Sequence, residues 1–200
     1  MGKLLYLGHG SYKITTSNQT VIYVDPYAGS DYKEKGDIVL ITHEHYDHNR
    51  IELVTFKNDQ GIIIRSKDLH PEENVYESRI VKDVKITATK AENANHNPLD
   101  CVGYIIEFDG IKLYAAGDTS YFEEMKMMSK MHIDYALLPT DGKYNMGPIE
   151  ASKVAKIINP KVAIPIHTRP GVLFDPNVAA QFQYKGKKVI LPNEEIELKI

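Results

Sequence analysis

Six consecutive residues combine side chains that bind metal ions. The segment His43-Glu44-His45-Tyr46-Asp47-His48 holds three imidazoles and two carboxylates, and only Thr42 separates it from the mostly β-branched run 37–41. Imidazole and carboxylate groups at such close spacing suit a divalent cation of the zinc, iron or manganese kind. The alternative is a solvent-exposed loop that is rich in histidine by chance, and the density of potential ligands argues against it.

The spacing inside this segment indicates two cation sites rather than one. His43 and His45 alternate, so in an extended backbone their side chains leave the same face. Asp47 and His48 are adjacent in the sequence and cannot both join that face. They therefore point toward a second position close by.

The pattern His-x-His-x-Asp-His resembles the signature of the metallo-β-lactamase-fold hydrolases. Four other segments resemble further motifs of that family, in the same order along the chain: Gly8-His9-Gly10-Ser11, the loop histidine His96, Gly117-Asp118-Thr119 and Pro165-Ile166-His167. The first of these is similar to a turn in the branch that includes the ascorbate-phosphate lactonases. The resemblance covers nearly the whole chain.

The resemblance implies a complete ligand set for two cations. One cation is expected on His43, His45 and His96, and the second on Asp47, His48 and His167, with Asp118 bridging the two. Zinc is the expected metal, with manganese and iron as alternatives. Two cations about 3.5–4 Å apart would lower the pKa of a shared water toward neutrality and make hydroxide the nucleophile. Asp47 and Asp118 are therefore predicted to be catalytic, and Asp47 could also orient the water.

Three further polar residues at turns and strand ends receive separate interpretations. His9 lies in a glycine-flanked turn, and it is either a residue that caps its own loop or a catalytic imidazole that faces substrate. Asp25 ends the predicted strand 21–24, where the family's acid hydrogen-bonds the backbone of the ligand loop, so it is not expected to be a ligand. His70 lies in a charged turn and is predicted to be on the surface.

Strands predicted from apolar and β-branched runs stand directly before most of these motifs. They cover residues 3–7, 12–16, 21–24, 37–41, 61–64, 81–89, 102–108, 111–115, 135–139, 161–166, 188–191 and 195–200. Helices are expected over 121–131 and from Pro148, since proline suits the first helical turn. A strand-rich first half followed by alternating strands and helices predicts an α/β fold in one domain, residues 1–200. We expect a four-layer αβ/βα sandwich, with two mixed β-sheets face to face and helices on the outer faces.

Composition and charge argue against several classes of partner. The chain has 200 residues and a net charge of −3, so no overall basic field recruits nucleic acid or an anionic membrane. Its apolar runs fall short of the roughly 18 residues that span a bilayer. The one cysteine, Cys101, cannot form an internal disulfide, and a reducing, cytoplasmic location is expected. Monomer and oligomer are equally compatible with these properties.

Three side chains are predicted to bind substrate. Arg169 lies two residues beyond the last metal-ligand candidate, and Lys143 and Tyr144 follow the predicted strand 135–139. If both strands end at the metal edge, these groups border one cleft, where Arg169 would grip a carboxylate or phosphate of a small-molecule substrate. An ion pair between Arg169 and Asp175 is an equally weighted alternative.

Three functions are compatible with these observations. We rank first a small binuclear metal-dependent hydrolase of an ester, lactone or phosphoester. A phosphodiesterase of nucleic acid or phospholipid comes second, because His45-Tyr46-Asp47-His48 also resembles the N-acylphosphatidylethanolamine phospholipases. The acidic charge balance and the lack of an apolar membrane-binding segment count against it. A non-catalytic metal-binding or redox module ranks third, since the similar flavodiiron proteins usually carry a carboxylate where His45 stands.

Overall fold

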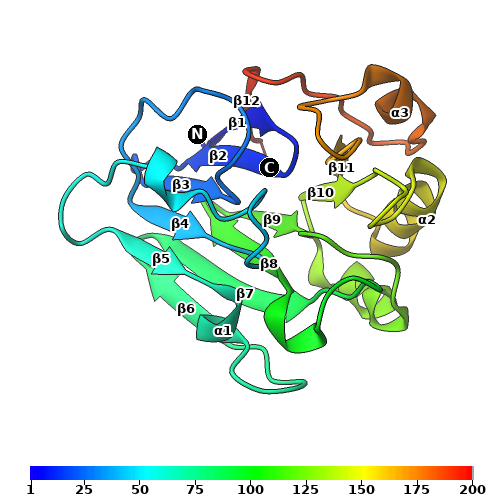
Figure 1. The fold of residues 1–200 in the computed structure, drawn as a ribbon, viewed down its shortest axis with the longest axis horizontal. Helices are drawn as coiled ribbons and strands as arrows, with labels where there is room; N and C mark the ends of the chain where they lie inside the picture. Colours follow the sequence, from blue (N-terminus) through cyan, green and yellow to red (C-terminus); the bar gives the residue numbers. More distant parts are fainter. Residues whose placement is uncertain (200) are drawn as a thin grey trace.

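The chain forms two six-stranded mixed β-sheets that pack face to face, as a computed structural model of residues 1–199 shows (Figure 1). The first sheet has the order β12-β1-β2-β3-β4-β5. Its strands are β1 (Lys3–Gly8), β2 (Ser11–Thr15), β3 (Val21–Val24), β4 (Ile38–Leu40), β5 (Ile62–Ile64) and β12 (Glu195–Glu197). The second sheet has the order β11-β10-β9-β8-β7-β6. Its strands are β6 (Ser78–Val81), β7 (Val84–Lys90), β8 (Val102–Phe108), β9 (Ile111–Ala115), β10 (Tyr135–Pro139) and β11 (Val162–Ile166).

Alternation along the strands divides the apolar side chains between layers. In β8, Val102, Tyr104 and Ile106 are buried between the two sheets, whereas Ile105 faces the helical layer outside. This period of two is the property of a strand that is covered on both faces. Each large apolar side chain buried in this way stabilises the folded state by roughly 1.5–3 kcal/mol relative to its exposure to water.

The helical elements lie mainly over the second sheet. They are η1 (Ile51–Leu53), α1 (Ser66–Leu69), η2 (Pro98–Asp100), η3 (Glu123–Met131), α2 (Pro148–Ile158) and α3 (Pro176–Gln181). Helix α2 packs on β10, β11, η3 and α3 (Figure 1). Over the first sheet, the outer layer is thinner and consists of η1 and loops, with Val54 buried and Tyr32 and Phe56 partly buried against Tyr23 and Val39. The predicted four-layer sandwich is confirmed, with this thinner layer in place of a long helix.

Parallel pairing brings several strand ends to one edge. In the first sheet, β3, β4 and β5 are parallel neighbours, and in the second sheet β9, β10 and β11 are parallel neighbours. Parallel strands end at the same edge of a sheet, and open α/β proteins bind ligands there. The residues within three positions after these strands include Asp25, Thr42, Asp118, Asp141 and His167.

Two predicted strands differ from the structure: β7 covers 84–89 of the predicted 81–89, whereas 188–191 forms no strand. The segment 81–89 is not one strand, because Lys82 adopts a left-handed φ of 55° in a two-residue turn between β6 and β7. The segment 188–191 is not a strand, although an isolated bridge pairs Lys187 with Ala163. There the backbone N–H of Leu191 donates to the Glu194 carboxylate instead of to a neighbouring strand.

Other predictions differ in smaller ways. The helix predicted over 121–131 is the 3₁₀ segment η3, in which Met125 and Met128 are buried but Met127 is exposed. The closing strand ends at Glu197, and Ile200 lies outside the described residues. His70 is buried, not on the surface, because its Nδ1 lies 2.7 Å from the Val75 carbonyl oxygen and its ring stacks on Tyr76. No helix within residues 1–199 is long and apolar enough to cross a membrane.

Candidate metal centre

Two glycines allow neighbouring groups to pack closely at this edge, because they carry no side chain. A Cβ on Gly10 would lie 2.9 Å from Cε1 of His48. Gly117 has a left-handed φ of 64°, and a Cβ there would lie 2.9 Å from the Val102 carbonyl oxygen. Larger residues at either position would displace the neighbouring ligand loops, so glycine is required at both.

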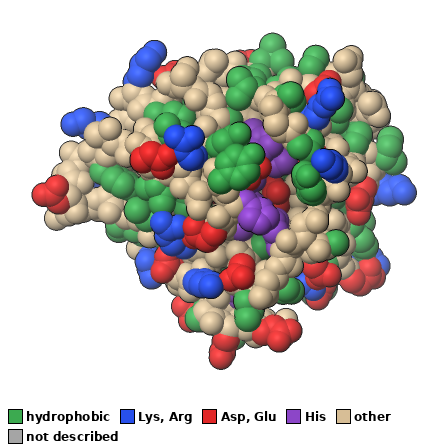
Figure 2. Space-filling model, viewed as in Figure 1, with side chains coloured by type: hydrophobic (Ala, Val, Ile, Leu, Met, Phe, Trp, Pro, Cys, Tyr) green, Lys and Arg blue, Asp and Glu red, His purple; other side chains and the backbone are tan. Residues whose placement is uncertain are grey.

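The first group of potential ligands consists of His43, His45 and His96. Their ligand atoms all lie within 4.8 Å of one another. Nε2 of His96 is 3.2 Å from Nδ1 of His45. His43 is buried, His96 is half-buried and His45 is exposed, so this group forms the open side of the centre. Imidazoles reach the surface here between hydrophobic side chains (Figure 2).

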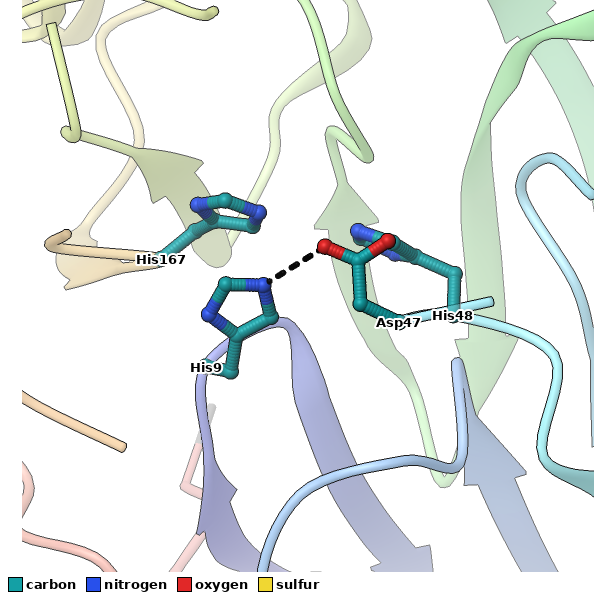
Figure 3. Close-up of side chains that lie close together, drawn as sticks. All are labelled: His9, Asp47, His48 and His167. Atoms are coloured by element: carbon teal, nitrogen blue, oxygen red, sulfur yellow. Dashed lines mark hydrogen bonds and ion pairs between the residues drawn. The ribbon is translucent and has the colours of Figure 1, made fainter. Parts of the chain in front are cut away.

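The second group consists of His9, Asp47, His48 and His167, again within 4.8 Å (Figure 3). His9 Nε2 donates a hydrogen bond to Asp47 Oδ2 over 3.2 Å. The ring centroids of His9 and His167 lie 3.7 Å apart. The backbone N–H of His167 donates to the backbone carbonyl oxygen of His9. Both residues have left-handed φ angles, 52° for His9 and 45° for His167. Such strain in residues other than glycine is typical of functional sites.

Asp118 lies between the two groups. Its Oδ1 is 3.5 Å from Nε2 of both His48 and His167, and its Oδ2 is 4.0 Å from Nε2 of His43. The two oxygens of one carboxylate therefore face different groups, which is the arrangement that a bridging ligand needs.

The unpartnered polar atoms of the chain are concentrated here. Within residues 1–199, nine buried side-chain nitrogen or oxygen atoms have no hydrogen-bond partner, and seven of them belong to this centre. They include Nε2 of His43, His48 and His167 and Oδ1 of Asp118. Buried polar atoms without partners are costly, so this donor set fits divalent cations, which would satisfy it.

Asp25 orients one histidine of each group. Its Oδ2 accepts from Nδ1 of His48 over 2.9 Å and from the Thr42 hydroxyl over 2.7 Å. Because Thr42 donates to Asp25, its oxygen is free to accept from Nδ1 of His43, 3.0 Å away. Both rings then present Nε2 to the centre. In metalloproteins, an acceptor bonded to the other ring nitrogen fixes the orientation of a ligand histidine in the same way. Asp25 Oδ1 also accepts from the Thr42 N–H, which confirms its predicted bond to the ligand loop.

Asp141 is a residue that sequence reasoning missed. Its Oδ2 lies 3.0 Å from Nδ1 of His167, which is an ion-pair distance, although the contact does not have the hydrogen-bond geometry that Asp25 has with His48. Its Oδ1 accepts from the backbone N–H groups of Lys143, Tyr144 and Asn145, which folds the following loop around it. The order Thr140-Asp141-Gly142 directly after the predicted strand 135–139 is the sequence signal that could have indicated it.

The ionisable groups of the centre perturb one another strongly. Burial lowers the pKa of His48, but the carboxylates of Asp118 and Asp25 outweigh it and raise this pKa to about 9. Burial raises the pKa of Asp118, yet the imidazoles of His48 and His167 hold it well below its usual range. The pKa of His43 is lowered by burial and by the neighbouring His48. Asp118 is thus ionised at neutral pH, and a cation that binds here would displace the proton on His48.

A cavity of about 390 Å³ opens over the centre. It is lined by His45, Tyr46, Asp47, Asn95, His96, Asp118, Tyr144, His167, Pro170 and Gly171. Of the predicted substrate-binding residues, Tyr144 lines it, while Lys143 lies over the Tyr144 ring at 4.8 Å and Arg169 lies 3.6 Å from the Asp175 carboxylate. A larger groove of about 580 Å³ lies over β7 and β8, so size alone does not locate the ligand site.

Comparison with known proteins agrees with this geometry. Residues 3–167 match the family described as "Beta-lactamase superfamily domain". The chain belongs to this superfamily. It is 34% identical to the UPF0173 metal-dependent hydrolase of Saccharolobus solfataricus, over 84% of each chain. It is also 30% identical to that of Thermococcus onnurineus, over 99% of this chain and 100% of the relative.

Solved structures support the same fold. The metallo hydrolase Igni18 from Ignicoccus hospitalis has a TM-score of 0.73 at 24% identity, over 99% of both chains. The metallo-beta-lactamase fold protein YhfI from Bacillus subtilis has a TM-score of 0.74 at 15% identity, over 98% of this chain and 100% of the other. Together with the family match and the UPF0173 relatives, this makes the chain a metal-dependent hydrolase and confirms its resemblance to the metallo-β-lactamase-fold hydrolases. The likeness of its first turn to the lactonase branch stays a prediction.

Proposed function

We propose that this hydrolase uses two divalent cations to cleave an ester, lactone or phosphoester bond in a small molecule. One observation carries the proposal: Asp118 directs its two oxygens toward different ligand groups. One group would be His43, His45 and His96, and the other Asp47, His48 and His167. Zinc is the proposed metal, with manganese or iron as alternatives, because imidazole and carboxylate ligands suit all three.

The protein's own groups would prepare the reaction. When bound, the cations would lower the pKa of a water toward neutrality and polarise the scissile carbonyl or phosphoryl oxygen. His9 holds Asp47 through Oδ2 and leaves Oδ1 available to a cation or to the proton of the attacking water. Asp25 and Asp141 keep the rings of His48 and His167 turned so that Nε2 faces the centre.

We propose a small-molecule substrate in preference to nucleic acid or phospholipid. A net charge of −3 provides no general attraction to nucleic acid, and it gives no help at an anionic lipid surface. The cytoplasmic location, the state of assembly and an anionic group held by Arg169 stay predictions. In the fold, Arg169 lies 3.6 Å from the Asp175 carboxylate.

Two measurements test the proposal. Elemental analysis of protein purified without added metal should find close to two equivalents of zinc, manganese or iron per chain. Esters, lactones and phosphodiesters assayed with each metal should include at least one substrate, and His48→Ala should remove most of that hydrolysis while the circular dichroism spectrum is kept. Metal content near zero, or full activity in His48→Ala, would contradict the proposal.

A further inference from the structure

Apolar side chains surround the mouth of the metal centre. Tyr46 is 72% exposed and Tyr144 is 43% exposed, and both line the 390 Å³ cavity. Val172 and Leu173, which directly follow the lining residue Gly171, are 39% and 47% exposed. Figure 2 shows hydrophobic side chains next to the histidines on this face. Large apolar groups left in solvent beside a catalytic centre suggest that a ligand covers them.

One part of this mouth is a row of aromatic rings that leads to the ligands. The ring of Tyr46 meets Tyr27 edge-on, with centroids 5.7 Å apart and an interplanar angle of 89°. Tyr27 in turn meets the ring of His9 at 5.6 Å, and His9 lies against His167. Tyr46 is thus supported by Tyr27 while most of its surface stays free to contact a flat group.

The other parts of the mouth are held by hydrogen bonds. Tyr144 is fixed through its backbone, since its N–H donates to Asp141 over 2.8 Å and its carbonyl oxygen accepts from Asn95 over 3.3 Å. The Leu173 carbonyl oxygen accepts from the backbone N–H of His9 over 2.6 Å. This bond holds the loop after His167 against the turn that contains His9. A preformed surface of this kind loses little conformational entropy when a ligand binds.

Among the described residues, the lining of the cavity has no cationic side chain that would anchor an anionic group of the substrate. Lys143 is not part of this lining, and its ammonium lies over the Tyr144 ring, 4.8 Å from the ring centroid. The carboxylates of the lining, Asp47 and Asp118, are ligand candidates that bound cations would neutralise. Arg169 faces Asp175, which also accepts from the backbone N–H groups at the start of α3.

We propose that the substrate carries an uncharged aromatic group next to its scissile bond, and that this group packs on Tyr46 and Tyr144. The inference rests on the proposed hydrolase function and adds a substrate class to it. Aromatic pairs gain affinity beyond the burial of their surface, so an aryl group can contact both tyrosines favourably.

Binding of three hydroxamates to the metal-loaded protein, measured by calorimetry, tests this substrate class. Acetohydroxamate, benzohydroxamate and the monohydroxamate of succinic acid share one chelating group and differ in what they place at the mouth. Benzohydroxamate should bind about tenfold more tightly than acetohydroxamate. Tyr46→Ala and Tyr144→Ala should each reduce that ratio several-fold, and Tyr46→Phe should keep it. Ile80→Ala is the matched control, because Ile80 is also 72% exposed but lies on β6 and does not line the cavity.

The outcomes separate this inference from the proposed function. Equal affinity for acetohydroxamate and benzohydroxamate would overturn the aromatic substrate class and leave the metal centre in place. Tightest binding of the succinic derivative, lost in Arg169→Ala, would overturn it in favour of an anionic substrate. Failure of the protein to take up metal or bind any hydroxamate would overturn the proposed function itself.

Discussion

A buried aspartate lies near each end of β4, and the two carboxylates differ in the groups that surround them. At the amino end, Asp37 accepts from the Val21 N–H over 2.8 Å and from Lys57 Nζ over 2.6 Å, and it also pairs with Lys82. At the carboxyl end, Asp118 faces imidazoles at 3.5 Å or more, and its Oδ1 has no hydrogen-bond partner. The chain's own donors satisfy Asp37, whereas among the described residues Oδ1 of Asp118 has no donor.

The difference shows how a fold separates stability from function. A buried carboxylate with lysine partners and a backbone N–H is compatible with a stable core. A buried carboxylate without such partners costs stability, and proteins keep such groups mainly at functional sites. The amino end of β4 should therefore matter for folding, and the carboxyl end for metal binding and catalysis.

The largest effect on activity is expected from Asp118→Asn, which removes the shared acid with almost no change in volume. Both ligand groups lose their common oxygen donor, so we expect fewer bound cations and at least about a hundredfold fall in kcat/KM. Elemental analysis and steady-state kinetics measure the two quantities. A variant with normal metal content and activity would remove the distinction between the two ends.

Asp141→Asn should have a smaller effect at the same end. An amide can still accept the backbone N–H groups of the loop, but it loses the charge that holds Nδ1 of His167. Metal affinity should fall about 10- to 100-fold, as measured by competition with a chelator. Asp175→Asn is a matched control, because Asp175 also accepts backbone N–H groups but contacts Arg169. An equal loss in both variants would mean that Asp141 acts only on the loop.

Asp37→Asn should lower stability without affecting metal binding or activity, in contrast to the variants at the carboxyl end. The acid is buried, but its lysine partners are 34% and 53% exposed, so solvent screening reduces the contribution of these pairs. We expect the free energy of unfolding to fall by about 2 kcal/mol, measured by urea denaturation of the metal-free protein. Metal content and kcat should stay normal. Loss of metal with unchanged stability would refute the assignment of roles to the two ends.

The smallest expected effect is on the pH dependence of stability. Burial raises the pKa of Asp37, but hydrogen bonds from Lys57 and Lys82 outweigh it and lower this pKa overall. A lowered pKa in the folded state gives stability that is present above the unfolded value, near 3.9, and is lost as the pH falls through the folded value. The metal-free protein should therefore lose stability below about pH 4. Asp37→Asn should lose less over the same range, and parallel curves for the two proteins would contradict this.

Local sequence determined the strands and the composition of the ligand loop. The run 37–41 is apolar and β-branched, and β4 forms there because side-chain alternation and β propensity act over a few neighbouring residues. The order of strands and helices also fits the four-layer fold that the motif resemblance implies, since such elements have few ways to bury their apolar faces. The metal-binding character of 43–48 needs only the residue types and their spacing.

Tertiary structure decided which distant groups support those residues. Asp141 meets His167 only because β10 and β11 pair in parallel and end at the same edge. His70 is buried because the chain returns and stacks Tyr76 on its ring, although its charged neighbours suggest a surface turn. The contact of Tyr46 with Tyr27 likewise joins two loops. Sequence patterns report a residue's near neighbours, whereas hydrogen bonds and ring contacts between loops depend on how the sheets bring remote segments together.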